Sequence, residues 1–141
     1  MVGNGNGYVG VGVGKSKDTV PAREKAIRKA KLNLFKIRRG AGSWEDSTTE
    51  PHSIPFRVEG KCGSVKIVLM PAPLGKGLII ESECAKILRL AGIKNVYSKT
   101  YGKTTSKQNV IEACIAALRK LNEFKARPAD IESVHMIEGR R

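Results

Sequence analysis

The amino-acid sequence predicts a mixed α+β protein assembled from two small units. Strand-like stretches occupy residues 8–14 and 64–70, whereas helix-like periodicity occupies residues 21–36 and 106–121. A polar stretch without periodicity, residues 40–55, separates the two groups of elements. A chain of 141 residues is long enough for one ordinary domain or for two small ones. The sequence therefore favours two α+β units joined by a connection.

The first residues of the chain are typical of a turn, and a glycine-rich strand is predicted after them. Residues 3–7 read Gly-Asn-Gly-Asn-Gly, and both residue types tolerate positive φ, so a turn is expected. Residues 8–14 then alternate valine with glycine, which predicts a strand with Val9, Val11 and Val13 on one face. The other face carries only hydrogen atoms, so something should approach this backbone closely. A packed helix and a nucleic-acid backbone are the two interpretations left open.

A strongly basic helix is expected over about residues 21–36. Pro21 suits the first helical position. Small or apolar residues recur every four positions, which indicates a helix: Ala22, Ala26, Ala30 and Leu34. Residues 15–39 contain ten basic and two acidic side chains. A solvated helix normally interleaves Glu with Lys at four-residue spacing, and this interleaving is almost absent here. Contact with phosphates is the favoured explanation.

The second unit begins with a predicted pair of strands. Residues 54–58 and 64–70 are expected to form strands joined by a short hairpin across residues 59–63. The composition of residues 71–77 predicts a loop, because two prolines lack the backbone N–H that pairs strands and two glycines allow unusual backbone conformations.

Two helices and a strand complete this second unit. A helix over residues 82–91 is stopped by Gly92, residues 95–101 form a strand, and Ser106 begins a long helix. The core-facing stripe of that last helix follows three- and four-residue spacing: Val110, Ala113, Cys114, Ala117, Leu118 and Leu121. From Lys125 onward the chain is polar and basic.

The charge of the chain points to a polyanionic partner. There are 26 Lys and Arg against 13 Asp and Glu, a formal net charge of +13, and confined like charges repel unless something neutralises them. An anionic membrane surface would require an amphipathic helix with large apolar anchors, and no helix carries an aromatic cluster. Nucleic acid is therefore favoured. Neither a signal peptide nor a bilayer-spanning stretch is expected.

Residues that would carry catalysis or bind metal are scarce. Residues 14–16 read Gly-Lys-Ser, the end of a phosphate-binding loop, but the first glycine of that motif falls on Val9. A dinucleotide-type GxGxxG string over residues 5–10 lies inside the predicted strand rather than between a strand and a helix. His52 and His135 lie far apart in polar surroundings and are expected to be exposed or locally bonded. No catalytic residue, metal or cofactor is expected.

The three cysteines lie far apart among apolar neighbours: Cys62, Cys84 and Cys114. Reduced thiols in a core are the simplest interpretation, and they favour the cytoplasm.

Residues 3–16 resemble the second half of the signature of small-subunit ribosomal protein five, a universal ribosomal family. Further stretches follow in that family's order: the basic helix, Pro-His-Ser-Ile-Pro-Phe at 51–56, the loop at 71–77 and Leu-Ala-Gly-Ile at 90–93. The resemblance extends to about Leu121. The long connection between Arg38 and Pro55, with its Gly-Ser-Trp, is similar to the archaeal or eukaryotic type.

The resemblance implies an architecture. Residues 1–40 would be the C-terminal part of a domain similar to double-stranded-RNA-binding folds, and residues 41–53 a linker. Residues 54–124 would form a β-β-α-β-α domain with a left-handed crossover, against the generic right-handed rule, and residues 125–141 a basic tail. A helix and strands precede the glycine hairpin in the family, so the chain is expected to lack the N-terminal portion of a longer protein.

The function implied by the resemblance is structural. The chain would bind small-subunit ribosomal RNA beside neighbouring small-subunit proteins and contribute to assembly and decoding accuracy, in the cytoplasm and without forming a homo-oligomer. The expected RNA contacts are Gly10, Gly12, Gly14, Lys15, Lys17, Arg23, Lys25, Arg28, Lys29, Lys31, Lys36, Arg38 and Arg39. A second candidate contact, with RNA or a protein, is the loop of Gly75, Lys76 and Gly77.

Two alternatives stay open at this point. One is an RNA-binding or chaperone factor outside the ribosome. The other, less favoured, is a phosphotransferase similar to small-molecule kinases that share the fold of the second domain. Those kinases need a Gly-Leu-Gly-Ser-Ser-type phosphate loop, and residues 73–77 lack the serines.

Overall fold

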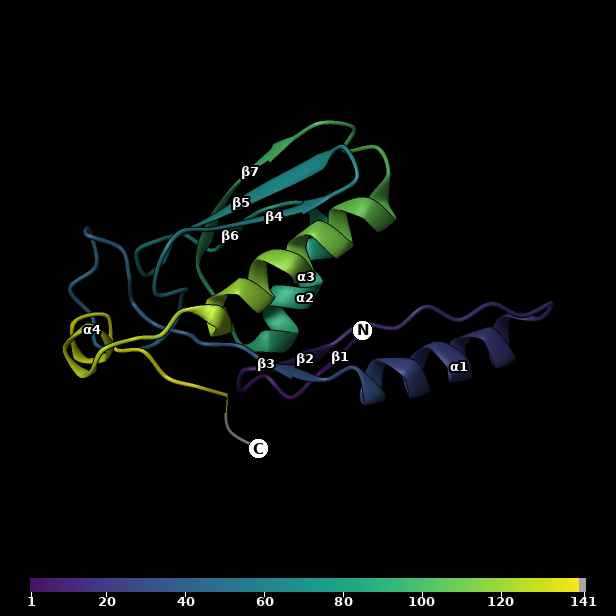
Figure 1. Cartoon of the computed structure of the whole chain (residues 1–141), viewed down its shortest axis with the longest axis horizontal. Helices are drawn as coiled ribbons and strands as arrows, with labels where there is room; N and C mark the ends of the chain where they lie inside the picture. Colours follow the sequence, from purple (N-terminus) through teal and green to yellow (C-terminus); the bar gives the residue numbers. More distant parts are fainter. Residues whose placement is uncertain (140–141) are drawn as a thin grey trace.

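The computed structural model describes residues 1–139 and is a mixed α+β fold with two sheets, as the sequence predicts (Figure 1). The end of the expected basic tail, residues 140–141, lies outside the described residues. The first sheet has the order β1-β2-β3, with antiparallel strands Val2–Gly3, Tyr8–Gly10 and Phe35–Lys36. Helix α1, Thr19–Leu32, connects β2 to β3.

The second sheet has four strands in the order β4-β5-β7-β6. Its strands are β4 (Val58–Cys62), β5 (Val65–Pro71), β6 (Leu78–Ile79) and β7 (Val96–Tyr101). Strands β4, β5 and β7 are antiparallel, and β6 is parallel to β7. Two helices, α2 (Ser82–Ala91) and α3 (Lys107–Glu123), lie on the same side of this sheet (Figure 1). A short helix, α4 (Pro128–Ser133), follows.

The predicted first strand of the second unit is shifted along the chain. We expected a strand over residues 54–58 and a turn over residues 59–63, but β4 runs through that expected turn. Gly60 lies in mid-strand because α3 crosses it closely: an added Cβ would lie 1.9 Å from the Ala113 carbonyl oxygen. The turn itself falls at Gly63, which has a φ of 59°.

Helix α3 packs as predicted. Its N-cap is Ser106, and all six residues of the expected apolar stripe are buried. They join β4, β5 and α2 in one core that also contains Cys84. The buried thiols of Cys84 and Cys114 and the partly buried thiol of Cys62 are all free.

Helix α1 ends four residues before the predicted end. The expected continuation to residue 36 fails because Asn33 closes the helix and Phe35 and Lys36 pair with β2. Ala30 is the one residue of α1 that is fully buried. The helix therefore lies along the edge of the molecule (Figure 1).

The first sheet meets the second unit at the C-terminal end of α2. The amide of Gly5 donates to the Leu90 carbonyl at 2.8 Å, and the amide of Gly7 donates to the Ala91 carbonyl at 2.9 Å. The turn between β1 and β2 thereby satisfies carbonyls that a helix end leaves without partners. Within the described residues, no helix is long and apolar enough to cross a membrane.

Candidate nucleic-acid interface

Seven of the predicted phosphate contacts are exposed cations on α1 and the segment before it, a set that we term the basic ridge. It comprises two residues of the extended segment before α1 and five residues of α1: Lys15, Lys17, Arg23, Lys25, Arg28, Lys29 and Lys31. All seven are exposed. No ion pair within residues 1–139 involves any of them. The ridge therefore presents positive charge that the described chain does not neutralise, as expected of a phosphate-binding surface.

The glycine face of the N-terminal segment is covered by α1. A Cβ added to Gly10 would lie 2.2 Å from the Ala30 carbonyl oxygen, and one added to Gly14 would lie 2.2 Å from the Ala22 carbonyl oxygen. A Cβ added to Gly12 would lie 2.4 Å from the Ala30 nitrogen. Of the two interpretations left open by the sequence, the packed helix is the one found on this face. Contact of these glycines with RNA is thereby restricted to their backbone edge.

Two of the predicted RNA contacts form ion pairs with the C-terminal segment. Lys36 and Arg38 both pair with Glu138, at 3.6 Å and 3.2 Å respectively. The Arg38 guanidinium also donates to the Phe124 carbonyl, and its side chain is only 18% exposed. These two cations stabilise the return of residues 134–138 onto the first unit. Phosphate contact at either position would compete with that carboxylate.

A cavity of about 700 Å³ brings together two regions that the sequence analysis treated separately. Its lining includes Arg39 after β3 and Gly77 from the loop before β6. Arg89 and Lys94, at the end of α2 and just beyond it, add two more cations. Glu50 supplies one carboxylate, which pairs with Lys94 at 3.2 Å. The cavity is therefore predominantly positive and lies at the junction of the two units.

The Gly75–Gly77 loop is a tight turn with an exposed tip. Gly75 and Gly77 have φ values of 89° and 74°, which side chains with a Cβ rarely adopt, and Lys76 between them is exposed. The amide of Gly77 donates to the Asn95 side-chain oxygen at 2.8 Å. A bonded side chain beneath it thus fixes the position of the loop.

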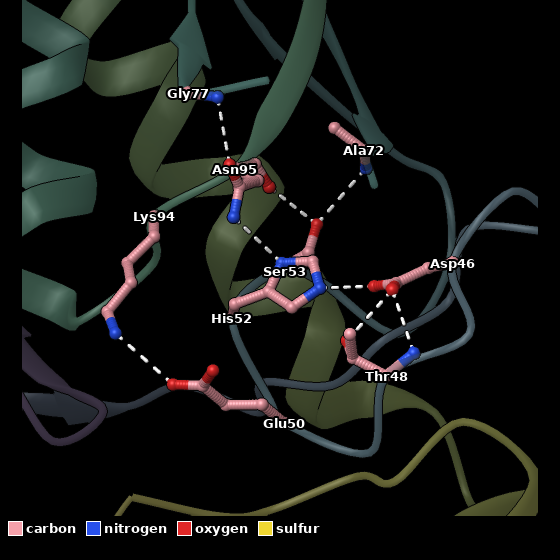
Figure 2. A network of polar contacts seen from close by, with 9 residues as sticks. All are labelled: Asp46, Thr48, Glu50, His52, Ser53, Ala72, Gly77, Lys94 and Asn95. Carbon is pink, nitrogen blue, oxygen red and sulfur yellow. Dashed lines mark hydrogen bonds and ion pairs between the residues drawn. The ribbon is translucent and has the colours of Figure 1, made fainter. Parts of the chain in front are cut away.

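A buried polar network links this loop to the segment before β4 (Figure 2). The Asn95 amide group lies 2.9 Å from His52 Nδ1, and His52 Nε2 meets the Asp46 carboxylate. Because the Asn95 oxygen already accepts from Gly77, its nitrogen is the donor, and His52 Nδ1 accepts. The proton of the neutral ring is then on Nε2, where it donates to Asp46. Ser53 adds bonds to the Asn95 carbonyl and the Ala72 amide.

The Asp46 carboxylate is stabilised as the charged form. Burial raises its pKa, but hydrogen bonds from the Thr48 amide and hydroxyl and from His52 together outweigh burial, so the pKa lies below its ordinary value. The side chains of His52 and Asp46 are 0% and 2% exposed. They are closed to a substrate and act on the fold, by joining residues 46–53 to the second sheet. We expected an exposed or locally bonded His52; its ring is buried and bonded both to Asp46 and to the distant Asn95.

This network could not be predicted from the sequence, because its partners lie far apart along the chain. Asp46 and His52 lie in a stretch without periodicity, and Asn95 follows 43 residues after His52. No local pattern connects such distant partners. The one available signal was the presence of His52, Ser53 and Asn95 beside strongly apolar residues such as Ile54 and Ile93.

Family models match both units of the chain. The model described as "Ribosomal protein S5, N-terminal domain" matches residues 1–38, and that described as "Ribosomal protein S5, C-terminal domain" matches residues 60–131. The chain belongs to the ribosomal protein S5 family. The family predicted from the glycine-rich signature and the order of the later stretches is therefore confirmed.

Curated members of the S5 family include proteins called small ribosomal subunit protein uS5. The protein of Nanoarchaeum equitans is 50% identical over 139 residues, which cover 99% of this chain and 60% of that protein. That of Methanococcus maripaludis strain C6 is 51% identical over 140 residues, covering 99% and 61%. That of Thermofilum pendens is 56% identical over 123 residues, covering 87% and 61%. The chain spans about 60% of the length of the relatives it matches.

The two S5 models leave residues 39–59 of this chain between them. This interval contains Asp46 and His52 of the buried network and one cation of the positive cavity, Arg39. The connection between the matched units is thus an ordered part of the structure.

Proposed function

We propose that this chain is a structural, RNA-binding constituent of the small ribosomal subunit. The observation that carries the proposal is the basic ridge, seven exposed cations without ion-pair partners within residues 1–139, in a member of the S5 family. The relatives named small ribosomal subunit protein uS5 support the assignment to that subunit. Assembly of the subunit and accuracy of decoding are the processes in which the chain would take part.

The ridge would contact the phosphate backbone of folded ribosomal RNA. Backbone charge dominates nucleic-acid affinity, and duplex RNA is recognised mainly by its shape and its phosphates. Lys36, Arg38 and Arg39 would extend this surface toward the positive cavity. Gly75, Lys76 and Gly77 would meet RNA or a neighbouring protein at the exposed tip of their loop.

The finer architecture belongs to the same proposal. Residues 1–40 would be part of a domain similar to double-stranded-RNA-binding folds, since β2, α1 and β3 place a helix against a small antiparallel sheet. Residues 54–124 would form the second domain, with a left-handed crossover from β6 through α2 to the parallel strand β7. Residues 41–53 would connect the domains, and residues 125–141 would form the basic tail.

The role would be non-enzymatic and would be performed in the cytoplasm, on the ribosome. Neighbouring small-subunit proteins would be the protein partners, and the chain would neither associate with membranes nor form a homo-oligomer. The high positive charge supports an RNA-bound state, because isolated chains of this charge repel one another.

Competition binding tests the proposal directly. The purified chain is bound to labelled small-subunit ribosomal RNA and challenged with unlabelled small-subunit or large-subunit ribosomal RNA. We expect the small-subunit RNA to compete at least about tenfold better, in line with ordinary specificity ratios. Equal competition by the two RNAs would assign the chain to general RNA binding outside the ribosome.

A further inference from the structure

One face of the second sheet has no helix on it. Helices α2 and α3 lie on the other side, and no helix among residues 1–139 covers this face (Figure 1). The strand register identifies its side chains, because directly paired residues point to the same side of a sheet. We call this surface the outer face. It carries three rows of paired residues: Lys61, Lys66 and Tyr101; Glu59, Val68 and Lys99; Met70, Tyr97 and Ile79.

Two of the three tyrosines of the chain lie on this face, on a single strand. Tyr97 and Tyr101 are separated by Ser98, Lys99 and Thr100, and Lys99 is the middle residue of the outer-facing set. A strand rises about 3.3 Å per residue, so the two rings are anchored about 13 Å apart along β7. Tyr101 is 47% exposed. The Lys99 ammonium lies 5.7 Å from the centre of the Tyr101 ring.

The charge of the outer face is positive. Its cations are Lys61, Lys66 and Lys99, and Arg57 lies just before β4. The one carboxylate, Glu59, pairs with Arg57 at 3.0 Å and with Lys66 at 2.8 Å. No ion pair within the described chain involves Lys61 or Lys99. A polyanion is therefore the partner that this face complements.

We infer that the outer face binds a single-stranded stretch of RNA. Phosphates meet Lys61 and Lys99, which have no ion pair within the described chain, and unpaired bases stack on Tyr97 and Tyr101. The exposed Tyr101 ring and the partly exposed Tyr97 ring alternate with Lys99 along β7. Aromatic rings alternating with cations hold single strands, because every base has a face that stacks and every linkage carries a charge. A duplex does not satisfy this surface, since its bases are already stacked on one another.

This inference deepens the proposed role in RNA binding and uses a different surface for a different form of RNA. The basic ridge lies on α1, whereas the outer face lies on the far side of α2 and α3 from that helix (Figure 1). The ridge presents cations without aromatic rings, so it suits the backbone of folded RNA. The outer face adds stacking, so it suits unpaired nucleotides. The two surfaces are separable by mutation.

Binding of two RNA probes by the intact chain tests the inference. The probes are a fluorescein-labelled oligouridylate of about 12 nucleotides and an RNA duplex of about 20 base pairs, both followed by fluorescence anisotropy. For Tyr97→Leu combined with Tyr101→Leu, we expect at least about tenfold weaker oligouridylate binding and unchanged duplex binding, because two stacking rings are removed. The third tyrosine gives the control, Tyr8→Leu, which should alter neither affinity. Oligouridylate affinity retained within about twofold would overturn the inference.

If the double tyrosine variant does not fold, a single charge substitution tests the same inference. Lys99→Gln removes one exposed cation from the outer face and should lower the salt slope of oligouridylate binding by about one, leaving the duplex slope unchanged. An unchanged oligouridylate slope counts against the inference.

Photocross-linking locates the contact independently. An oligouridylate carrying 4-thiouridine should cross-link to peptides containing Tyr97 or Tyr101; cross-links confined to α1 would contradict the inference. Arg28→Gln combined with Lys29→Gln reports separately on the ridge, since it should weaken duplex binding only. If the tyrosine variants enter ribosomal subunits poorly but bind oligouridylate normally, the outer face docks a protein, and the inference is wrong.

Discussion

Gly12 lies where the segment after β2 runs alongside α1, and the absence of its side chain allows the close approach. An added Cβ would meet the Ala30 nitrogen at 2.4 Å and the Ala26 carbonyl oxygen at 2.6 Å. Both are backbone atoms of a helix, so neither moves aside without shifting α1. The position of the basic ridge therefore depends on a glycine that is packed against the backbone of α1.

Substitution at this position should loosen α1. We expect Gly12→Val to lower the free energy of unfolding by about 2 kcal/mol or more, because overpacking against backbone forces the helix away. Val13, the next residue, is 51% exposed, and Val13→Thr should change stability by less than about 0.5 kcal/mol. Urea denaturation followed by circular dichroism measures both. Equal effects of the two substitutions would mean that this segment is not tightly packed against α1.

The Asp46 carboxylate is the anchor of the buried network. Asp46→Ala leaves the His52 Nε2 hydrogen and the Thr48 donors without their acceptor. Loss of a buried acceptor costs about 1–3 kcal/mol, and we expect a destabilisation in that range by urea denaturation. Its neighbour Glu45 is exposed, so Glu45→Ala is the matched control and should be nearly neutral. A neutral Asp46→Ala would show that the network contributes nothing to stability.

The same carboxylate gives a pH dependence with a defined sign. Its pKa in the folded chain lies below the ordinary value of 3.8, so the unfolded state binds the proton more readily. Its contribution is fully present above pH 3.8 and is lost as pH falls through the lowered pKa of the folded state. The stability difference between the natural chain and Asp46→Ala should therefore shrink as the pH falls below that value. A difference that grows on acidification contradicts this assignment.

Single residues also mark the limit of the sequence analysis. The glycines of residues 10–14 correctly predicted that another segment packs closely against this backbone, because the sequence shows where side chains are absent. These glycines did not show whether a helix or RNA packs against them, since either could occupy the space left by the absent side chains. Gly60 was interpreted as part of a turn for the same reason: a glycine required by a crossing helix and a glycine required by a turn look alike.

At the scale of elements, periodicity predicted position well where it coincides with core packing. Helix α3 begins directly after Ser106 and buries its apolar stripe, and both features were found where expected. Helix α1 has a weak apolar stripe, and its sequence supports helix beyond Asn33. Its end is decided by pairing of β3 with β2, a tertiary contact that local propensity does not contain.

The function assigned to α1 predicts a salt effect. Arg28→Gln combined with Lys29→Gln should reduce the salt slope of ribosomal-RNA binding by roughly two, about 0.9 for each phosphate that is no longer neutralised. Lys86→Gln combined with Lys107→Gln gives the same change in net charge, but Lys86 and Lys107 are paired with Glu83 and Glu81. That control should leave the slope nearly unchanged. Equal slopes for the two double variants would show that only overall charge matters.

At the scale of the whole molecule, the two units are joined by contacts that no local pattern foretells. The turn at residues 4–7 caps α2, and residues 46–53 are bonded to Asn95. The outer face is a further example, because aromatic residues that could stack on bases are scarce in the chain as a whole. Two tyrosines are enough when one strand places both on the same face. The family, by contrast, could be predicted from the sequence, because a family resemblance depends on the order of residues along the chain.

The most direct measurement is sedimentation of the natural full-length protein through a high-salt sucrose gradient, with Arg28→Gln plus Lys29→Gln as the comparison. A constituent of the subunit is held by many phosphate contacts and should remain in the small-subunit peak, while the variant should be partly released. Release of the natural protein to the top fractions would contradict the account and would identify a transient RNA-binding factor instead.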